Sequence, residues 1–222
     1  MLVKIFVSKM RKEGPTKALK AAFKYACYIC KSKRPRMLWR FSDSIPPPDS
    51  YKRNLVRQCA HRFSLRILIE TGTYFGEMVD AVRNEFDCIA SIELDDVLYE
   101  RAAGRFAKWG HIRIYHGDSA SVLPEILKSV SQPCLFWLDS HYCGGVTAKG
   151  SKVTPVVEEL GTILAHPIEA HVILVDDARC FRGVGDWPTL EALRNLVITA
   201  RAGWVFEVRH DIIRIHRGPV DS

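Results

Sequence analysis

The stretch Arg66–Gly76, RILIETGTYFG, decides the fold of this chain. Its pattern predicts an apolar strand that ends in an acid, Glu70, followed by a tight turn with two glycines and then by an amphipathic helix. A strand that leads through a glycine-bearing turn into a helix N-terminus is how α/β folds build nucleotide sites. A second acid, Glu93, ends the next apolar strand 21 residues after Gly72, the separation at which such folds place a carboxylate on ribose hydroxyls.

Apolar strands and amphipathic helices alternate from this stretch to the end of the chain. Strands are expected at 66–70, 88–93, 112–116, 134–139, 171–176, 204–208 and 212–216. Helices are expected at 51–62, at about 77–86, after the second strand to about residue 108, and at 121–128, 153–165 and 189–199. The short link between the last two strands makes them an antiparallel hairpin. The pattern therefore predicts an α/β, Rossmann-like, doubly wound and mostly parallel seven-stranded sheet with an antiparallel C-terminal hairpin.

Acidic residues end successive predicted strands. They are Glu70, Glu93, Asp139 and Asp176, with Asp118 just beyond the third strand. Ligands of open α/β sheets bind outside the carboxyl ends of the strands. Exposure of strand ends explains any single acid, but five acids at one edge are better explained by a ligand site.

The turn after the first strand does not suit a phosphate. A dinucleotide fingerprint needs glycines where this chain has Tyr74 and Glu77, and Glu77 would repel a phosphate at the helix N-terminus. The Gly-Lys-Ser/Thr signature of a phosphate-binding loop is also absent. A nucleoside ligand without phosphates is expected, and S-adenosylmethionine fits because its cationic sulfonium and ammonium tolerate acids.

Five segments, in this order and spacing, support a family resemblance. They are ETGTYFG (70–76), SIELDD (91–96), HGDSASVLP (116–124), FWLDSHY (136–142) and ILVDDA (173–178). The region that they span resembles the seven-strand Rossmann-like, or class I, S-adenosylmethionine-dependent methyltransferases, of the catechol and macrocin O-methyltransferase type. The resemblance covers about half of the chain and implies a methyltransferase domain at residues 51–222.

The resemblance implies a set of cofactor contacts by position. These positions are Glu70, Gly72, Thr73, Gly76, Glu93, Asp118, Ser119 and Asp139. Glu70, Gly72 and Gly76 would shape the methionine end of the pocket. Glu93 would bind the ribose hydroxyls, Asp118 and Ser119 would contact the adenine, and Asp139 would lie below the sulfonium.

The same resemblance implies a divalent metal ion. In those O-methyltransferases an acid after the fourth strand and an adjacent pair after the fifth bind the ion, and Asp139, Asp176 and Asp177 occupy these positions. Three carboxylates suit Mg²⁺, which would draw a substrate hydroxyl toward its alkoxide. The alternative is a metal-independent enzyme in which Asp176 and Asp177 are structural or cofactor-side acids.

His141 is the candidate general base, beside Asp139 as the second catalytic candidate. It lies two residues beyond Asp139, and its ordinary pKa near 6.5 suits removal of a hydroxyl proton. Catechol-type enzymes have a lysine near this place, so His141 departs from their pattern. The alternative is a hydrogen-bonded loop residue.

The acceptor is expected to be a small molecule or glycan, methylated on a sugar-like hydroxyl. The segment ARCFRGVGDWP (178–188) predicts a rim in which Arg179 and Arg182 meet an anionic acceptor and Phe181 and Trp187 stack on a ring. The alternative is a solvated loop with two packed aromatic residues.

The positive charge of the chain is confined to its N-terminus. The net charge is +7, but residues 1–40 carry twelve Lys or Arg and one acid, giving +11, so the remainder carries −4. Residues 1–50 are predicted to be a basic helical arm with a Pro-rich linker. The arm could contact an anionic membrane surface or pack on the body. No nucleic-acid partner is expected because no motif accompanies the charge.

The chain is expected to be cytoplasmic, with the inner membrane surface as a peripheral location if the arm binds lipid. It has no apolar run long enough for a membrane span, no secretory signal, and an odd number of cysteines. The sequence thus predicts a metal-assisted S-adenosylmethionine-dependent O-methyltransferase. The alternatives are a metal-independent methyltransferase, an NAD-dependent oxidoreductase and a non-catalytic binding protein on the same fold.

Overall fold

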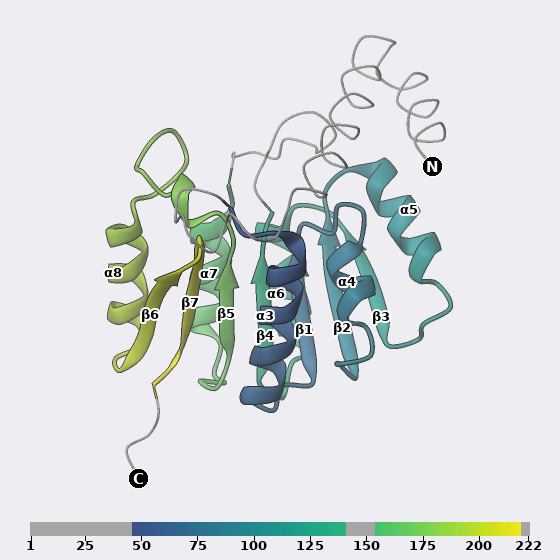
Figure 1. Cartoon of the computed structure of the whole chain (residues 1–222), viewed down its shortest axis with the longest axis horizontal. Coiled ribbons are helices and arrows are strands. Elements are labelled where there is room, and N and C mark those ends of the chain that lie inside the picture. The colour runs from purple at the N-terminus through teal and green to yellow at the C-terminus, as the bar shows by residue number, and fades with distance from the viewer. Residues whose placement is uncertain (1–45, 141–153, 219–222) are drawn as a thin grey trace.

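The protein is a seven-stranded sheet with helices on both faces, seen in a computed structural model that describes residues 46–140 and 154–218 (Figure 1). The strands are β1 (Ile67–Thr71), β2 (Cys88–Glu93), β3 (Ile112–His116), β4 (Cys134–Leu138), β5 (Val172–Val175), β6 (Trp204–Arg209) and β7 (Ile212–Arg217). Their order is β3-β2-β1-β4-β5-β7-β6. Strands β1 to β5 pair in parallel, whereas β7 is antiparallel to both β5 and β6. The predicted fold class is confirmed.

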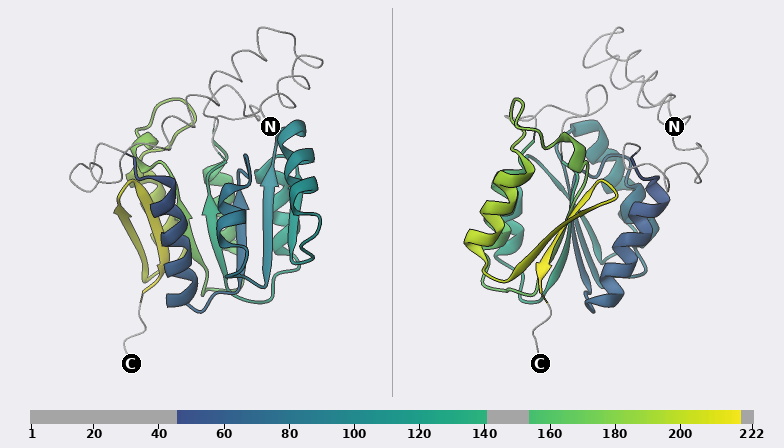
Figure 2. Two further views of the ribbon diagram at one scale, coloured as in Figure 1. Left: turned by 45° about the vertical axis from the view of Figure 1, so that its right-hand side comes forward. Right: turned by 60° about the vertical axis from the view of Figure 1, so that its left-hand side comes forward.

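Two layers of helices sandwich the sheet (Figure 2). One layer is α3 (Asp49–Arg62), α4 (Glu77–Val82) and α5 (Asp96–Phe106), and the other is α6 (Ser119–Leu127), α7 (Val156–Ala165) and α8 (Leu190–Ala200). Successive strand residues serve opposite cores: Leu68 packs in the α3–α5 core, and Ile69 in the α6–α8 core. This double burial explains why the central strands read as continuous apolar runs.

Side-chain caps set the first residue of three helices. The Asp95 carboxylate accepts hydrogen bonds from the Val97 and Leu98 amides, and Thr189 accepts one from Ala192. Asp118 accepts one from the Ala120 amide at 3.0 Å, so α6 begins two residues earlier than the apolar pattern predicted. Capping satisfies amides that have no partner within the helix.

The strand order reverses between β1 and β4. The chain winds from β1 outward to β3 and then returns to place β4 on the other side of β1. The carboxyl ends of β1 and β4 therefore flank the place where such sheets bind ligands. Gly72 makes the close approach there possible: its φ is +89°, and a Cβ on it would lie 2.3 Å from the Asp139 carbonyl oxygen.

The predicted arm lies mostly outside the described residues, which begin at residue 46, just before α3. None of the helices over residues 46–140 and 154–218 combines the length and the apolar character that crossing a bilayer requires.

We predict opposite effects of alanine at two glycines. Gly72→Ala should lower the free energy of unfolding by at least about 2 kcal/mol, because the new Cβ meets main-chain atoms and the backbone is left-handed. Gly104→Ala, within α5 and with open space around its Cβ, should raise it by about 0.5–1 kcal/mol. Urea denaturation measures both, and equal stability of Gly72→Ala and wild type would contradict the close approach.

Candidate active site

Glu93, at the end of β2, fixes the turn that follows β1. Its carboxylate accepts hydrogen bonds from the main-chain amides of Tyr74 at 2.7 Å and Asp95 at 2.9 Å. Tyr74 is held in the left-handed region, with φ of +50°. Burial raises the pKa of Glu93 to about 7, although these amides oppose the rise. The carboxylate thus lies at the sequence-predicted place, beside the β1 turn.

Glu70, at the end of β1, is buried among hydroxyl groups. The Ser91 hydroxyl donates to the Glu70 carboxylate, and the Thr73 hydroxyl lies 2.6 Å from that of Ser91. Burial raises the pKa of Glu70 to about 8, and the negative charges of Asp139 and Glu93 add to the rise. A cationic ligand near these carboxylates would be stabilised by them.

The turn between Gly72 and Gly76 is held on both sides. The Gly72 and Thr73 amides donate to the Ile92 carbonyl at 2.9 and 3.1 Å. Gly76 caps α4 in the left-handed region, and a Cβ there would lie 2.6 Å from the Phe106 ring. The positions assigned to the methionine side of the pocket thus form one rigid turn against β2 and α5.

The Glu159 carboxyl lies among hydroxyl groups at the same edge of the sheet. Glu159, in α7, is 1% exposed and accepts a hydrogen bond from the Ser140 hydroxyl at 2.7 Å, and the hydroxyls of Ser119 and Thr71 lie near the same carboxyl. Burial raises the pKa of Glu159, although hydrogen bonds from these hydroxyls oppose the rise. Glu159 was not among the predicted site residues. The available signal was its position three residues after Val156, on the apolar face of the helix.

Asp139, Asp176 and Asp177 form an acid triad. One carboxylate oxygen from each residue lies within 4.8 Å of those of the other two. Asp176 and Asp177 are buried, and Asp176 Oδ1 has no hydrogen-bond partner among the described residues. Arg179 donates to Asp177 at 2.6 Å and also pairs with Asp211. The three predicted metal ligands do converge, with an oxygen-only donor set that fits a hard cation.

Lys52 brings a positive charge into the acid triad. It extends from the first turn of α3, and its Nζ contacts Asp176 Oδ2 across 124 residues of sequence. Burial alone would lower the pKa of Lys52, but the charges of Asp176, Asp139 and Asp177 together raise it above its ordinary value. Lys52 was also not predicted. The signal was its place on the apolar side of the helix, three residues before Leu55.

The rim residues pack more than the sequence suggested. Phe181 is 4% exposed, lies in the α6–α8 core and meets the Trp187 ring edge-on at 5.0 Å. Arg179 is engaged with Asp177 and Asp211, whereas Arg182 is exposed. The stacking role considered for Phe181 is therefore wrong, and the packed-aromatic alternative holds for it. His141, the predicted base, lies outside the described residues.

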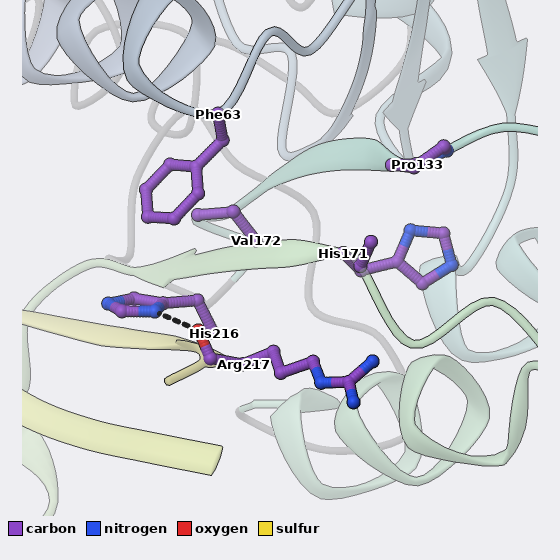
Figure 3. Close-up of a pocket in the computed structure, with 7 residues that line it drawn as sticks. Phe63, Pro133, His171, Val172, His216 and Arg217 are labelled. Atoms are coloured by element: carbon purple, nitrogen blue, oxygen red, sulfur yellow. Dashed lines mark hydrogen bonds between the residues drawn. The ribbon is translucent and has the colours of Figure 1, made fainter. Parts of the chain in front are cut away.

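A cavity of about 140 Å³ lies at the opposite edge of the sheet, by the amino ends of β4 and β5 (Figure 3). Phe63, His171 and His216 are among its lining residues, and no predicted site residue is. Buried His171 accepts from the Cys134 amide at 3.0 Å, and burial lowers its pKa to about 4. This neutral histidine is explained by packing, so the cavity is not part of the candidate site.

Solved structures share the fold of this chain at low sequence identity. The O-methyltransferase TomG of Streptomyces achromogenes, in complex with S-adenosylmethionine, aligns with a TM-score of 0.55 and 16% identity, over 76% of this chain and 80% of TomG. The chain has the fold of a class I methyltransferase. An O-methyltransferase of Bacillus cereus in complex with S-adenosylhomocysteine aligns over 98% of this chain and 100% of its own, with a TM-score of 0.56 and 11% identity.

A third methyltransferase, PaMTH1 of Podospora anserina, bound to S-adenosylhomocysteine, aligns with a TM-score of 0.52 and 13% identity, over 88% of this chain and 94% of PaMTH1. Comparison of the sequence with protein-family models and with curated proteins gives no match. The family resemblance is thus confirmed at the level of the methyltransferase fold.

We predict that Glu70 makes this methyltransferase fold less stable as the pH rises. Its folded-state pKa of about 8 exceeds its ordinary value of 4.5, so the folded state binds more protons than the unfolded chain between these values. The contribution of Glu70 to the free energy of unfolding is therefore fully present below about pH 4.5 and is lost as the pH rises toward 8. Glu70→Gln removes this pH dependence. The difference in free energy of unfolding between the variant and wild type should therefore shift in favour of the variant by roughly 1–3 kcal/mol from pH 5 to pH 8.

Urea denaturation at several pH values measures the difference. Glu207→Gln, at an exposed position of β6, is the matched control and should follow the wild-type curve. Parallel curves for wild type and Glu70→Gln would contradict the raised pKa.

Proposed function

We propose that this protein is an S-adenosylmethionine-dependent O-methyltransferase. One observation carries the proposal: the glycine turn after β1 packs directly against Asp139, the first acid of the triad. A turn suited to a phosphate-free nucleoside and a cluster suited to activating an oxygen therefore share one sheet edge. Methyl donor and acceptor must meet within contact distance, and this adjacency provides for it.

The residues of the turn and of neighbouring strands would bind the cofactor. Glu93 would accept the ribose hydroxyls, and the turn around Gly72 would contact the methionine end. Asp118 and Ser119 would contact the adenine. TomG and the Bacillus cereus enzyme are described with S-adenosylmethionine or its product, which supports this ligand class. Buried carboxylates suit a sulfonium cation in particular, since they stabilise positive charge.

In the reaction, the acceptor oxygen forms a bond to the methyl carbon as the carbon–sulfur bond breaks. The sulfonium becomes a neutral thioether, and the acceptor hydroxyl loses its proton. Asp139 would lie below the sulfonium, and His141 would take the proton. The rigid turn against β2 would hold the methyl group in line with the attacking oxygen.

A divalent ion such as Mg²⁺ would be held by Asp139, Asp176 and Asp177. Their spacing within 4.8 Å and the unpartnered Asp176 Oδ1 fit an oxygen-coordinated ion. When bound, the ion would lower the pKa of an acceptor hydroxyl. Arg179 would keep Asp177 oriented. A metal-independent methyltransferase is the second candidate. One observation supports it: Lys52 contacts Asp176 and so already places a cation at the acid triad.

The acceptor that we propose is a hydroxyl of a sugar or glycan-like molecule. With Phe181 buried, the described rim offers little aromatic surface for a flat ring, whereas exposed Arg182 offers a donor for polar or anionic groups. The basic character of residues 1–40 would favour peripheral contact with an anionic membrane surface.

Ligand binding tests the proposed cofactor. S-adenosylhomocysteine should raise the melting temperature and NAD should not, since the β1 turn lacks the glycines of a dinucleotide site. Glu93→Ala should weaken S-adenosylhomocysteine binding at least about tenfold in calorimetry, through loss of charge-assisted hydrogen bonds. Glu207→Ala is the matched exposed control. Stabilisation by NAD alone would exclude the proposed function.

Metal removal tests the proposed ion. Methyl-labelled cofactor and a cell extract should give a labelled acceptor, and Asp139→Asn should abolish the label. EDTA should abolish turnover and Mg²⁺ restore it, because the triad would then lack its ion. Full turnover in EDTA would reject the metal and leave methyl transfer standing.

A further inference from the structure

Lys52 and a metal ion would compete for the negative charge of the same three carboxylates. The Lys52 ammonium contacts Asp176 Oδ2, and the charges of Asp139 and Asp177 also act on it. These are the three acids whose oxygen atoms lie within 4.8 Å of one another. Two cations at such separations repel strongly when the surroundings are buried. The lysine contact and coordination of an ion by the triad therefore oppose each other.

Lys52 also has a structural reason to be there. The Asp176 side chain is 1% exposed, and a carboxylate at that depth is costly unless it has a partner. Asp177 is compensated from another direction by Arg179. Lys52, with a side chain only 16% exposed, is the basic group that the described residues offer to Asp176.

We propose that Lys52 is an internal counter-cation of the acid triad, which a divalent ion must displace in order to bind. The inference rests on the proposed function, because the ion is the one assigned there to methyl transfer. In the metal-free protein, Lys52 keeps the triad charge-compensated. On metal binding, its ammonium leaves Asp176, and the energy of the lost ion pair weakens the observed affinity for the metal.

The test is metal affinity in the absence of cofactor and acceptor. Mn²⁺ binding is measured by titration calorimetry for the full chain and for two variants, Lys52→Gln and Lys52→Arg. Glutamine can still donate a hydrogen bond to Asp176 but carries no charge, whereas arginine keeps the charge. Lys128→Gln, at an exposed lysine that pairs with Glu125, is the matched control.

Lys52→Gln should bind Mn²⁺ at least about tenfold more tightly than wild type, because no cation has to leave. Lys52→Arg and Lys128→Gln should stay within about threefold of wild type. In EDTA, Lys52→Gln should also melt at a lower temperature than wild type, and Mn²⁺ should restore more of its stability. This readout applies even if the variant folds only with metal.

Equal or weaker Mn²⁺ binding by Lys52→Gln would overturn the inference, and so would absence of binding by every variant. Neither result bears on the proposed methyl transfer, which S-adenosylhomocysteine binding and label transfer test separately. Conversely, tighter Mn²⁺ binding by Lys52→Gln in a protein that does not bind S-adenosylhomocysteine would retain the exchange and reject the proposed function.

Discussion

The approach of the Gly72 main chain to the Asp139 carbonyl is the contact on which the candidate site depends. It brings the end of β1 against the end of β4, where the strand order reverses, and a side chain at residue 72 would prevent it. The Asp139 amide in turn donates to the Thr71 carbonyl at 3.0 Å. The cofactor turn and the acid triad are thus parts of one main-chain arrangement.

Buried acids dominate the electrostatics of this edge. Glu70, Glu93 and Glu159 are nearly inaccessible to water, and burial raises the pKa of each. At the triad, Lys52 and Arg179 bring positive charge to Asp176 and Asp177. An edge of this kind stabilises cations, which connects the proposed sulfonium ligand and the proposed metal ion through one physical cause.

Local sequence predicted the strands and the acids at their ends, because an apolar run and the acid after it are adjacent in the chain. The start of α6 was missed by two residues since the cap at Asp118 acts outside the apolar period. Lys52 and Glu159 were missed for another reason. Their contacts depend on which helix covers which face of the sheet, and the Lys52 contact spans 124 residues. Packing also removed Phe181 from the rim.

The contacts that shape the β1 turn are made largely by the peptide backbone. The Ile92 carbonyl accepts hydrogen bonds from the amides of Gly72 and Thr73. The Glu93 carboxylate accepts one from the main-chain amide of Tyr74, not from its side chain. Main-chain geometry of this kind places few demands on side-chain identity beyond a glycine and an acid. An architecture held by such main-chain contacts tolerates extensive replacement of side chains, in keeping with a fold shared at 11% sequence identity.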